Sequence, residues 1–254
     1  MKLLKSNLLT PFKNLTHAFS TRYGGYSKSP YNTNNLAFHV GDNPNRVLKN
    51  HKKLSYRLKY NYKKLVHMRQ IHSDIVHVVD KNDNFFNPKE CDALITNRLY
   101  TPLMVMSADC TPLIIYDSDL HVIALLHVGR AGAFKNIIKK SVTKMTKLFT
   151  SKIDSLHVSI GPSIHGCCYE IDKTIADEAK ELGYADMLSF RDEKIFLHVN
   201  DIIKAQLKDL SIEKTEEISI CTSCENKSFF SYRADKKVTG RNSAVVMLTD
   251  NHKL

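Results

Sequence analysis

The sequence predicts an α+β sandwich, because strand-like runs and helical patterns are interspersed along the chain without forming strict strand–helix–strand units. Short β-branched and aliphatic runs bounded by turn residues are typical of buried strands. They lie at residues 65–71, 75–79, 102–106, 112–117, 122–128, 157–161, 217–222 and 243–249. Ser73 and Asp74 separate the first two runs and predict a hairpin turn between them. No linker, low-complexity tract or fixed-period repeat is visible in the sequence.

Four helices are expected between these strands. Asn43 and Pro44 are typical of a helix start, with the asparagine as cap and the proline at the first helical position. A second pattern follows Gly132, where apolar residues recur at three- and four-residue spacing. The other two patterns begin at Asp172 and at Val199.

Composition and charge fit a globular protein with a full core. Of the 254 residues, 43% are hydrophobic and 25% are charged, and the net charge of +11 favours anionic partners. Basic residues interleaved with tyrosines are densest at 51–64, a pattern that could bind nucleic acid. The same segment carries leucines at near-helical spacing, so a surface helix with a basic outer face is the favoured interpretation over nucleic-acid binding.

The cysteines and the N-terminus bear on the location of the protein. Six cysteines in a chain of this length do not form a disulfide scaffold, and they favour a reducing compartment. Residues 1–10 lack the continuous apolar segment of a signal peptide, and no run approaches membrane-spanning length. We therefore expect a cytoplasmic protein with no membrane among its partners. The sequence does not decide the oligomeric state, and a monomer is our expectation.

Three side chains that can bind metals stand at the ends of apolar runs. They are His72, Cys110 and His127. Rigid scaffolds present chemistry to solvent at such positions. Two histidines and one cysteine would make a three-ligand set with an open fourth position, which is typical of a catalytic zinc site. Their spacing does not prove that they converge, and a core cysteine with structural histidines is the alternative interpretation.

Asp109 precedes Cys110 and bears on the chemistry of its thiol. A neighbouring carboxylate raises the pKa of a thiol, whereas a bound metal cation deprotonates the thiol. The two residues together therefore favour a metal site over a free thiolate nucleophile. Asp109 could then orient a ligand or act as a general acid or base.

Other motifs are weaker on their own. Arg22 stands at a strand end before a Gly-Gly turn, where a guanidinium can bind a phosphate or a carboxylate. Cys167 and Cys168 lie in a loop, and a locally satisfied loop is the expectation there. Cys221 and Cys224 form half of a zinc-ribbon pattern, but a second Cys-x-x-Cys is missing, so no zinc site is predicted from them.

Taken together and in order, segments from Phe19 to Leu248 resemble the YfiH family, also described as laccase-domain or polyphenol oxidase proteins and as purine nucleoside phosphorylases. The matching segments are residues 19–25, 35–36, 39–42, 70–72, 92–96, 108–112, 127–129, 161–164, 168–171, 229–233 and 239–241. The resemblance implies a single domain over residues 1–254 with α/β/β/α layers and mixed sheets. It also implies similarity to the catalytic domain of cytotoxic necrotizing factor toxins.

The resemblance implies a metal site at the residues already singled out. Zinc would be held by His72, Cys110 and His127, which match the family's ligand positions. The implied activity is phosphorolysis of adenosine, guanosine or inosine to a free base and ribose 1-phosphate, so purine nucleosides and phosphate are the expected partners. Cleavage of methylthioadenosine, deamination of adenosine and a copper-dependent phenol oxidase activity are also associated with the family, which makes copper the alternative metal.

Roles for the remaining side chains follow from the chemistry of phosphorolysis. We expect phosphate to be bound by arginines, with Arg22 as the first choice and Arg130, Arg233 and Arg241 behind it. We expect Asp109 to donate a proton to the departing purine, with His39 as the second choice. Asn35 and Gln70 lie in matching segments and are expected to bind substrate.

One departure from the family pattern concerns an arginine. The family usually reads His-Ala-Gly-Trp-Arg-Gly, whereas residues 127–132 read His-Val-Gly-Arg-Ala-Gly. The tryptophan is absent and Arg130 stands one position early, which puts its role in substrate binding in doubt.

Three other functions are open on the sequence alone. A cysteine hydrolase would use Cys110 as nucleophile and His127 as base, and it would work without metal. A copper oxidase would need more histidine motifs for a multinuclear cluster than the sequence offers. A non-catalytic nucleic-acid-binding protein would use residues 51–64 and bind in a strongly salt-dependent manner.

Overall fold

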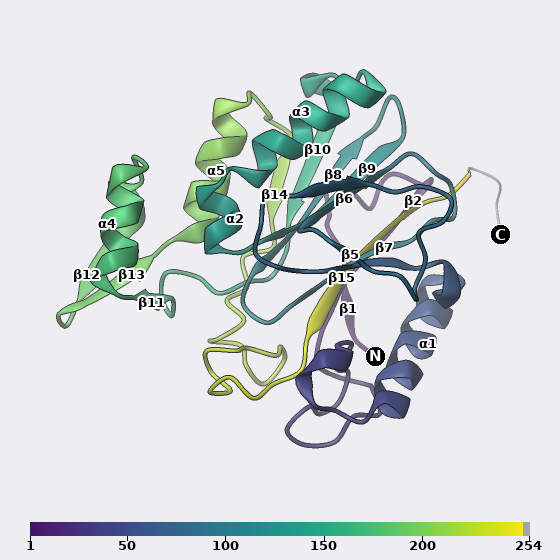
Figure 1. The fold of residues 1–254 in the computed structure, drawn as a ribbon, viewed down its shortest axis with the longest axis horizontal. Helices are drawn as coiled ribbons and strands as arrows, with labels where there is room; N and C mark the ends of the chain where they lie inside the picture. The colour runs from purple at the N-terminus through teal and green to yellow at the C-terminus, as the bar shows by residue number, and fades with distance from the viewer. Residues whose placement is uncertain (251–254) are drawn as a thin grey trace.

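The computed structural model describes residues 1–250, in which two mixed six-stranded sheets form the centre of the molecule (Figure 1). The first sheet consists, in spatial order, of β1 (Leu3–Leu4), β2 (Leu15–Ser20), β15 (Asn242–Leu248), β7 (Leu103–Ser107), β3 (Val66–Arg69) and β5 (Lys89–Glu90). The second consists of β14 (Thr215–Glu217), β10 (Leu156–Ile160), β8 (Thr111–Asp117), β9 (Val122–Val128), β6 (Ala93–Thr96) and β4 (Val76–Val78). Each sheet contains parallel and antiparallel neighbours, so the prediction of mixed sheets is confirmed.

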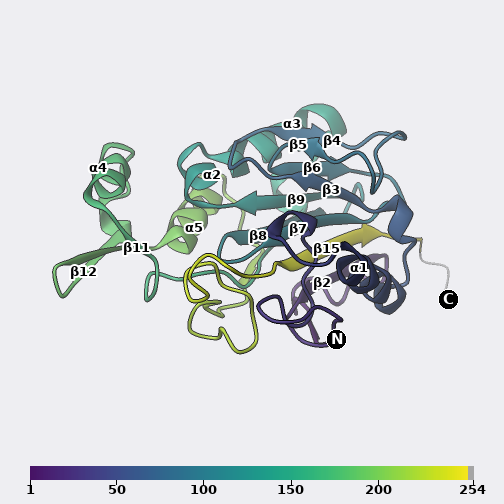
Figure 2. The same ribbon diagram turned by 60° about the horizontal axis from the view of Figure 1, so that its bottom comes forward.

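Helices cover the outer face of each sheet (Figure 2). α1 (Pro44–Leu58) covers the first sheet, and α2 (Arg130–Phe134), α3 (Ile137–Phe149) and α5 (Val199–Asp209) cover the second. The remaining helix, α4 (Lys173–Glu181), lies to one side. Leu54 of α1 shares an apolar cluster with Met104 of the first sheet, and Ile138 of α3 shares another with Ile115 of the second. The molecule therefore has helix, sheet, sheet and helix layers. The similarity to the toxin domain stays a prediction.

The central strands of the second sheet are buried on both faces. Ile114 of β8 and Leu125 of β9 lie in the cluster between the sheets, whereas Ile115 and Ala124 lie in the cluster beneath the helices. Successive side chains of a strand point to opposite faces. A strand covered on both faces needs an apolar residue at each position, which explains the continuous apolar runs of the sequence.

A smaller antiparallel sheet projects to one side of the molecule together with α4 (Figure 2). It consists of β11 (Glu170–Ile171), β13 (Lys194–Leu197) and β12 (Leu188–Arg191). The predicted cap is present at the start of α4, where a carboxylate oxygen of Asp172 accepts a hydrogen bond from the Ile175 amide at 2.9 Å. The Asn43 side chain caps α1 in the same way, and Pro44 is its first residue.

The predicted hairpin turn at Ser73 and Asp74 is wrong. The strands before and after it, β3 and β4, belong to different sheets, so residues 70–75 cross from one sheet to the other. The Ser73 amide and hydroxyl both donate hydrogen bonds to the buried Asp92 carboxylate, at 2.6 and 2.7 Å. The Asp92 carboxylate therefore fixes the connection between the two sheets. The apolar pattern of the sequence gave no indication of this contact.

Two other boundaries differ from the sequence prediction. The strand expected at 217–222 ends at Glu217, because the following residues form loop contacts and only an isolated bridge joins Ser163 to Cys221. The helix expected after Gly132 is two helices, α2 and α3. Asn136 separates them in a left-handed conformation, with φ +54, and its side chain accepts a hydrogen bond from Lys139 to cap α3.

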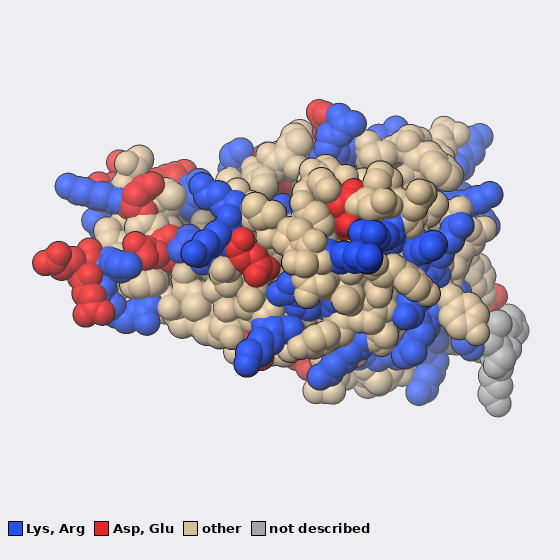
Figure 3. Space-filling view, turned by 90° about the horizontal axis from the view of Figure 1, so that it is seen from below, with Lys and Arg blue, Asp and Glu red and all other residues tan. Residues whose placement is uncertain are grey.

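The basic segment 51–64 behaves as the amphipathic pattern predicts. Most of it belongs to α1, which buries Val47, Leu54 and Leu58 and turns its lysines outward. Figure 3 shows lysine and arginine side chains scattered over the face that it draws, interspersed with acidic groups on the projecting part. Among residues 1–250, no helix is both long enough and apolar enough to cross a membrane.

Candidate active site

The structure brings His72, Cys110 and His127 together where the ends of the two sheets meet. His72 follows β3 of the first sheet, Cys110 immediately precedes β8, and His127 lies near the end of the neighbouring strand β9. Their potential ligand atoms all lie within 4.8 Å of one another. The Cys110 Sγ is 3.9 Å from His72 Nε2, and the two imidazole centroids are 5.0 Å apart. The convergence that spacing could not prove is therefore present.

A single buried carboxylate positions both histidines. Asp92, which immediately precedes β6, accepts a hydrogen bond from His127 Nδ1 at 2.8 Å. It also accepts hydrogen bonds from the backbone amides of Ile71, His72 and Ser73, at 3.3, 3.2 and 2.6 Å. Burial raises the pKa of Asp92, but hydrogen bonds from His127 and Ser73 outweigh it and lower the pKa to about 2. Asp92 is therefore charged at neutral pH, and His127 has Nε2 left for another partner.

The backbone around the three side chains is constrained. His72 has a φ of +57, a left-handed conformation that residues other than glycine seldom adopt. The hydrogen bond from its amide to Asp92 holds it there. At Gly129, an added Cβ would lie 2.9 Å from Cys110 Sγ and 3.3 Å from His72 Cδ2. Any larger residue at position 129 would therefore displace the Cys110 sulfur or the His72 ring.

Cys110 and His127 shift each other's protonation. Burial raises the pKa of the Cys110 thiol, but the charge of His127 and hydrogen bonds from both histidines lower it to about 6. Burial lowers the pKa of His127, but the Cys110 charge and the Asp92 hydrogen bond raise it to about 9. The fall in the thiol pKa is opposite to the rise expected from the neighbouring Asp109. The histidines, rather than the adjacent carboxylate, dominate the environment of the sulfur.

A pocket of about 740 Å³ opens beside the three residues, a volume within the usual range for small-molecule sites. Its lining combines apolar, aromatic and basic side chains. The lining residues are His39, Met68, Arg69, Gln70, His72, Met106, Ser107, Ala108, Asp109, Cys110, His127, Ile164, Tyr169, Tyr232, Arg233, Lys236, Lys237 and Arg241. The mixture suits a flat ring with an attached or accompanying anion.

Five further residues predicted from the sequence also line this pocket: His39, Gln70, Asp109, Arg233 and Arg241. Gln70 exchanges two hydrogen bonds with the Met106 backbone, at 2.7 and 3.0 Å, which ties the end of β3 to β7. Arg241 donates from Nη1 to the carbonyl oxygens of residues 239 and 240. Burial, followed by the charge of Arg241, lowers the pKa of His39, so its imidazole is neutral at neutral pH.

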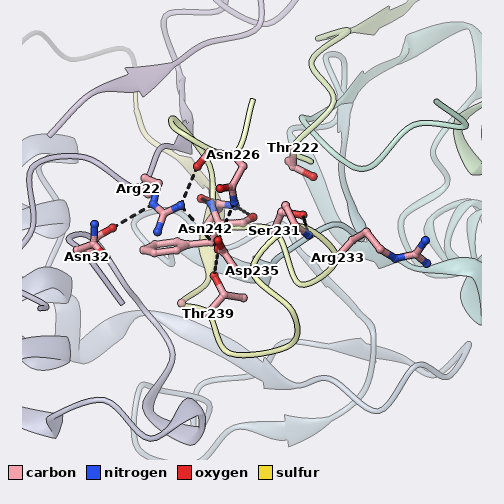
Figure 4. Close-up of polar contacts among 12 residues, drawn as sticks. Arg22, Asn32, Thr222, Asn226, Ser231, Arg233, Asp235, Thr239 and Asn242 are labelled. Atoms are coloured by element: carbon pink, nitrogen blue, oxygen red, sulfur yellow. Dashed lines mark hydrogen bonds and ion pairs between the residues drawn. The ribbon is translucent and has the colours of Figure 1, made fainter. Parts of the chain in front are cut away.

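Arg22 does not line the pocket, although it was the first choice for phosphate. Its guanidinium donates hydrogen bonds to the carbonyl oxygens of Asn32 and Asn226 at 3.0 and 2.7 Å. It also lies 4.7 Å from the centroid of the Phe230 ring. Figure 4 shows Arg22 directed into this loop network, away from Arg233. The donors of the guanidinium are used to join loops, so the structure does not support a direct role in binding phosphate.

Asn35 and Arg130 also lie outside the pocket lining. Asn35 is fully buried, and its side-chain oxygen accepts a hydrogen bond from the Arg241 amide at 3.0 Å, so it positions a pocket residue rather than contacting the pocket. Arg130 forms an ion pair with Glu178 of α4 at 2.8 Å. The early position of this arginine in the motif places it at the start of α2, facing the projecting part of the molecule.

Asp109 lines the pocket but has both carboxylate oxygens engaged. One accepts a hydrogen bond from the Thr222 hydroxyl at 2.8 Å, and the other accepts one from the Arg233 amide at 2.7 Å. The carboxylate thereby links the loop that carries Cys110 to the loops at Thr222 and Arg233. These contacts favour a positioning role over proton donation.

Sequence reasoning missed several residues of the site. Asp92 opened one of the family segments, but nothing in its local pattern marked it as the partner of two distant histidines. Tyr169 and Tyr232 also lay in such segments, beside residues that were singled out. Lys236 and Lys237 carried no signal beyond charge. All four of the latter residues line the pocket.

The three converging side chains fit a zinc ion. Two imidazoles and one thiolate are ligands that zinc prefers, and three protein ligands leave a fourth position open toward the pocket. The hydrogen bond from His127 Nδ1 to Asp92 is the contact that usually orients a metal-bound histidine. No ligand contact requires a change of fold, because the ligand atoms already lie within 4.8 Å of one another.

Known proteins resemble this chain over most of its length. The sequence profile of the family described as multi-copper polyphenol oxidoreductase laccase matches residues 16–249. A purine nucleoside phosphorylase of Corynebacterium glutamicum is 34% identical over 231 residues, 91% of this chain and 93% of that protein. One from Campylobacter jejuni is 40% identical over 190 residues, 74% and 78% of the two chains. The crystal structure of the hypothetical protein YfiH from Bacillus licheniformis has a TM-score of 0.88 and 29% identity, covering 92% of this chain and 93% of that one.

Proposed function

The chain belongs to the family described as multi-copper polyphenol oxidoreductase laccase, as its resemblance to YfiH indicated, and we propose that it is a zinc-dependent purine nucleoside phosphorylase. The observation that carries this proposal is the convergence of His72, Cys110 and His127 beside a pocket with basic and aromatic walls. Relatives named purine nucleoside phosphorylase align with 91% and 74% of the chain.

His72, Cys110 and His127 would hold the zinc ion. When bound, zinc would act as a Lewis acid toward an oxygen atom of a ligand in the pocket. Asp92 keeps the His127 ring and the His72 backbone in place, so the ligands need little reorganisation. Gly129 leaves the space that the sulfur occupies.

Phosphate would bind to the basic side chains that line the pocket. Arg233, Arg241, Lys236 and Lys237 line it. Arg22 instead donates hydrogen bonds to loop carbonyls, and Arg130 pairs with Glu178. Hydrogen bonds to backbone carbonyls fix the guanidinium of Arg241 before any substrate arrives. A preorganised cation costs less to align with an anion than a free side chain does.

In phosphorolysis, a phosphate oxygen bonds to C1′ of the ribose while the bond from C1′ to the purine nitrogen breaks. The purine takes the bonding electron pair and must gain a proton. His39 lines the pocket as a neutral imidazole and can donate a hydrogen bond to the leaving base. Tyr169 and Tyr232 offer flat surfaces for the purine ring. Asp109 holds the Cys110 loop in place, and Gln70 aligns the ends of β3 and β7.

The proposal includes finer points that follow the family. Adenosine, inosine and guanosine are the substrates to test, with methylthioadenosine cleavage and adenosine deamination as further activities. The whole of residues 1–254 would act as one domain, since the site takes residues from both sheets. Six free cysteines suit a cytoplasmic location, where thiols remain reduced.

The test combines metal content with product analysis. Purified protein and its Cys110→Ala variant would be assayed with adenosine and inosine, with and without phosphate. We expect about one zinc to be lost in the variant, together with phosphate-dependent release of base and ribose 1-phosphate. A Cys91→Ala variant, which removes a buried thiol that is not one of the three proposed ligands, is the matched control and should retain metal and activity. Base release without ribose 1-phosphate, or no release, would contradict the proposal.

A thiol hydrolase is the second candidate, because Asp92, His127 and Cys110 are arranged like a carboxylate, base and nucleophile. The low pKa of the thiol fits that function. His72 distinguishes the two proposals, since a third ligand has no role in such a triad. A hydrolase would keep its activity after chelation and would be inactivated by a thiol-trapping reagent.

Copper is the alternative metal, since two histidines and a cysteine can also bind it. Among residues 1–250, the groups of potential metal ligands contain only two histidines, His72 and His127, fewer than a multinuclear copper centre needs. Elemental analysis of the same preparations identifies the bound metal as zinc or copper. Visible absorption is a second readout, because copper bound to a thiolate gives an intense colour.

A further inference from the structure

A second group of potential metal ligands lies outside the candidate active site. Cys167, Cys168, Cys221 and Cys224 come from two loops that are distant in the sequence, yet their four sulfur atoms all lie within 4.8 Å of one another. The Cys224 sulfur is 3.5 Å from that of Cys167 and 3.4 Å from that of Cys168. The sulfurs of Cys167 and Cys168 are 3.8 Å apart. Neither the locally satisfied loop nor the incomplete zinc ribbon of the sequence prediction describes this arrangement.

We propose that these four cysteines bind a second zinc ion, as a closed structural site with four thiolate ligands. Zinc–sulfur bonds of about 2.3 Å in a tetrahedron place the sulfurs ~3.8 Å apart. The distances of 3.4 to 3.8 Å found here match that spacing closely. A four-iron cluster would lie between its thiolates and hold them farther apart. A disulfide would join only two of the four sulfurs, at about 2 Å.

The loop backbones are shaped to present the sulfurs. The amides of Cys168 and Tyr169 both donate hydrogen bonds to the His165 carbonyl at 2.9 Å, which forms a tight turn around the adjacent pair of cysteines. The Glu225 amide donates to the Cys221 carbonyl at 2.9 Å, which closes the other turn. The amide of His165 donates to the Cys221 sulfur at 3.4 Å, a contact that typically supports a metal-bound thiolate.

Two arginines compensate the charge of such a site. One zinc ion with four thiolates carries a net charge of −2, which nearby cations stabilise. Arg191 donates hydrogen bonds to the Gly166 and Cys167 carbonyls at 3.2 and 2.9 Å. Arg233 donates to the Cys168 carbonyl at 3.1 Å. Both guanidinium groups therefore lie against the turn that carries the first two ligands.

The site joins two segments that form one wall of the pocket. The segment with Cys167 and Cys168 also carries Ile164 and Tyr169, which line the pocket. The segment after Cys221 begins with Thr222, whose hydroxyl binds Asp109 at 2.8 Å, next to Cys110. The second zinc would act as a structural tie between these segments and would not touch the substrate. Its presence does not depend on the reaction proposed for the other site.

The test counts metal ions in the full-length protein, purified under reducing conditions without chelator. Native mass spectrometry and elemental analysis should find two zinc ions per chain. Cys224→Ser should lose one of these zinc ions, because it removes a ligand of the four-cysteine site. The variant should still fold, since Cys224 is exposed and its replacement leaves no cavity in the core. Cys110→Ala should lose the other. The Cys91→Ala variant should keep both.

Cobalt gives a readout that is independent of stability and activity. Protein loaded with Co²⁺ should show an intense thiolate-to-metal absorption from a four-sulfur site, which Cys224→Ser removes and Cys110→Ala retains. Cys224→Ser should also be cleaved faster by protease near residues 161–170 and 220–233. The proposal is overturned by one zinc per chain that is lost only in Cys110→Ala, by iron in place of zinc, or by a disulfide among the four cysteines in non-reduced protein.

Discussion

The two groups of potential metal ligands are built in different ways. His72, Cys110 and His127 stand at the ends of strands and face a pocket, whereas the four cysteines lie on loops and face one another. The first group has three ligands and a buried carboxylate, Asp92, that orients two of them. The second has four thiols, of which Cys167 and Cys224 are exposed. Three ligands oriented by a buried carboxylate leave a coordination position free, which suits a catalytic metal site. Four protein ligands fill the coordination of zinc, which suits a structural site.

The largest effect expected to sharpen this contrast comes from Asp92→Asn. The variant removes the charge that fixes the His127 ring and keeps a side chain of the same size. We expect zinc affinity at the three-ligand site to fall by about 10- to 100-fold, with a parallel loss of activity, as for other partners of metal-bound histidines. The four-cysteine site should keep its metal. Titration with a zinc chelator, followed by metal counting, measures both affinities in one experiment.

The chain offers a matched control for that substitution. Asp83 also accepts a short hydrogen bond from a histidine, with 2.6 Å between its Oδ2 and His77 Nε2, and it is likewise buried. His77 and Asp83 belong to neither group of potential ligands. Asp83→Asn should lower stability and leave both zinc affinities unchanged. Equal losses of zinc in the two variants would mean that Asp92 acts only through general stability.

The same contrast explains what the sequence could predict. The ends of apolar runs singled out His72, Cys110 and His127 as candidates, but the local pattern did not show that they converge, and only the family resemblance implied a shared metal. The four-cysteine group could not be predicted, because it depends on how two loops fold against each other. Asp92 was missed for a similar reason, since its partners lie on another strand and in a crossing connection that the apolar pattern predicted as a hairpin.

The roles of the arginines also depend on contacts between distant loops, which local sequence does not show. A strand end and a glycine turn marked Arg22, but only the packed loops show that its donors are used. Arg241 lines the pocket, so Arg241→Ala should raise the KM for phosphate about tenfold, the loss expected for a charge-assisted hydrogen bond. Both metal sites should remain filled. Steady-state kinetics with varied phosphate, alongside metal counting, measures this effect.

Arg130→Ala is the matched comparison for Arg241→Ala. Arg130 forms a partly exposed ion pair with Glu178 and lies outside the pocket lining. Pairs of this kind contribute little to stability. We expect the KM for phosphate to change by less than about twofold, within the range of a lost surface ion pair. If the KM for phosphate rose more in Arg130→Ala than in Arg241→Ala, Arg130 rather than Arg241 would be the phosphate-binding residue.

The last prediction concerns acid, which can release metal from both groups and so reduce the measured difference between them. Two histidines that belong to neither group provide an acid response of their own. Burial lowers the pKa of His17 to about 4 and that of His51 to about 3, against about 6.5 in the unfolded chain. The unfolded chain therefore binds more protons below pH 6.5. Their contribution to stability is complete above that pH and is lost progressively as the pH falls from 6.5 toward 4.

His51→Gln separates this response from metal release. The glutamine amide can still donate to the Leu36 carbonyl, which His51 contacts at 2.7 Å, but it does not titrate. Each buried neutral histidine makes the unfolding free energy fall by up to about 1.4 kcal/mol per pH unit, so the variant should lose that much of the slope between pH 6 and 4. Urea unfolding at several pH values measures the slope. The same reduction should occur when Cys110→Ala and Cys224→Ser are both present, because protons on His51 do not compete with zinc. A reduction seen only in the metal-loaded protein would instead connect α1 to the metal sites.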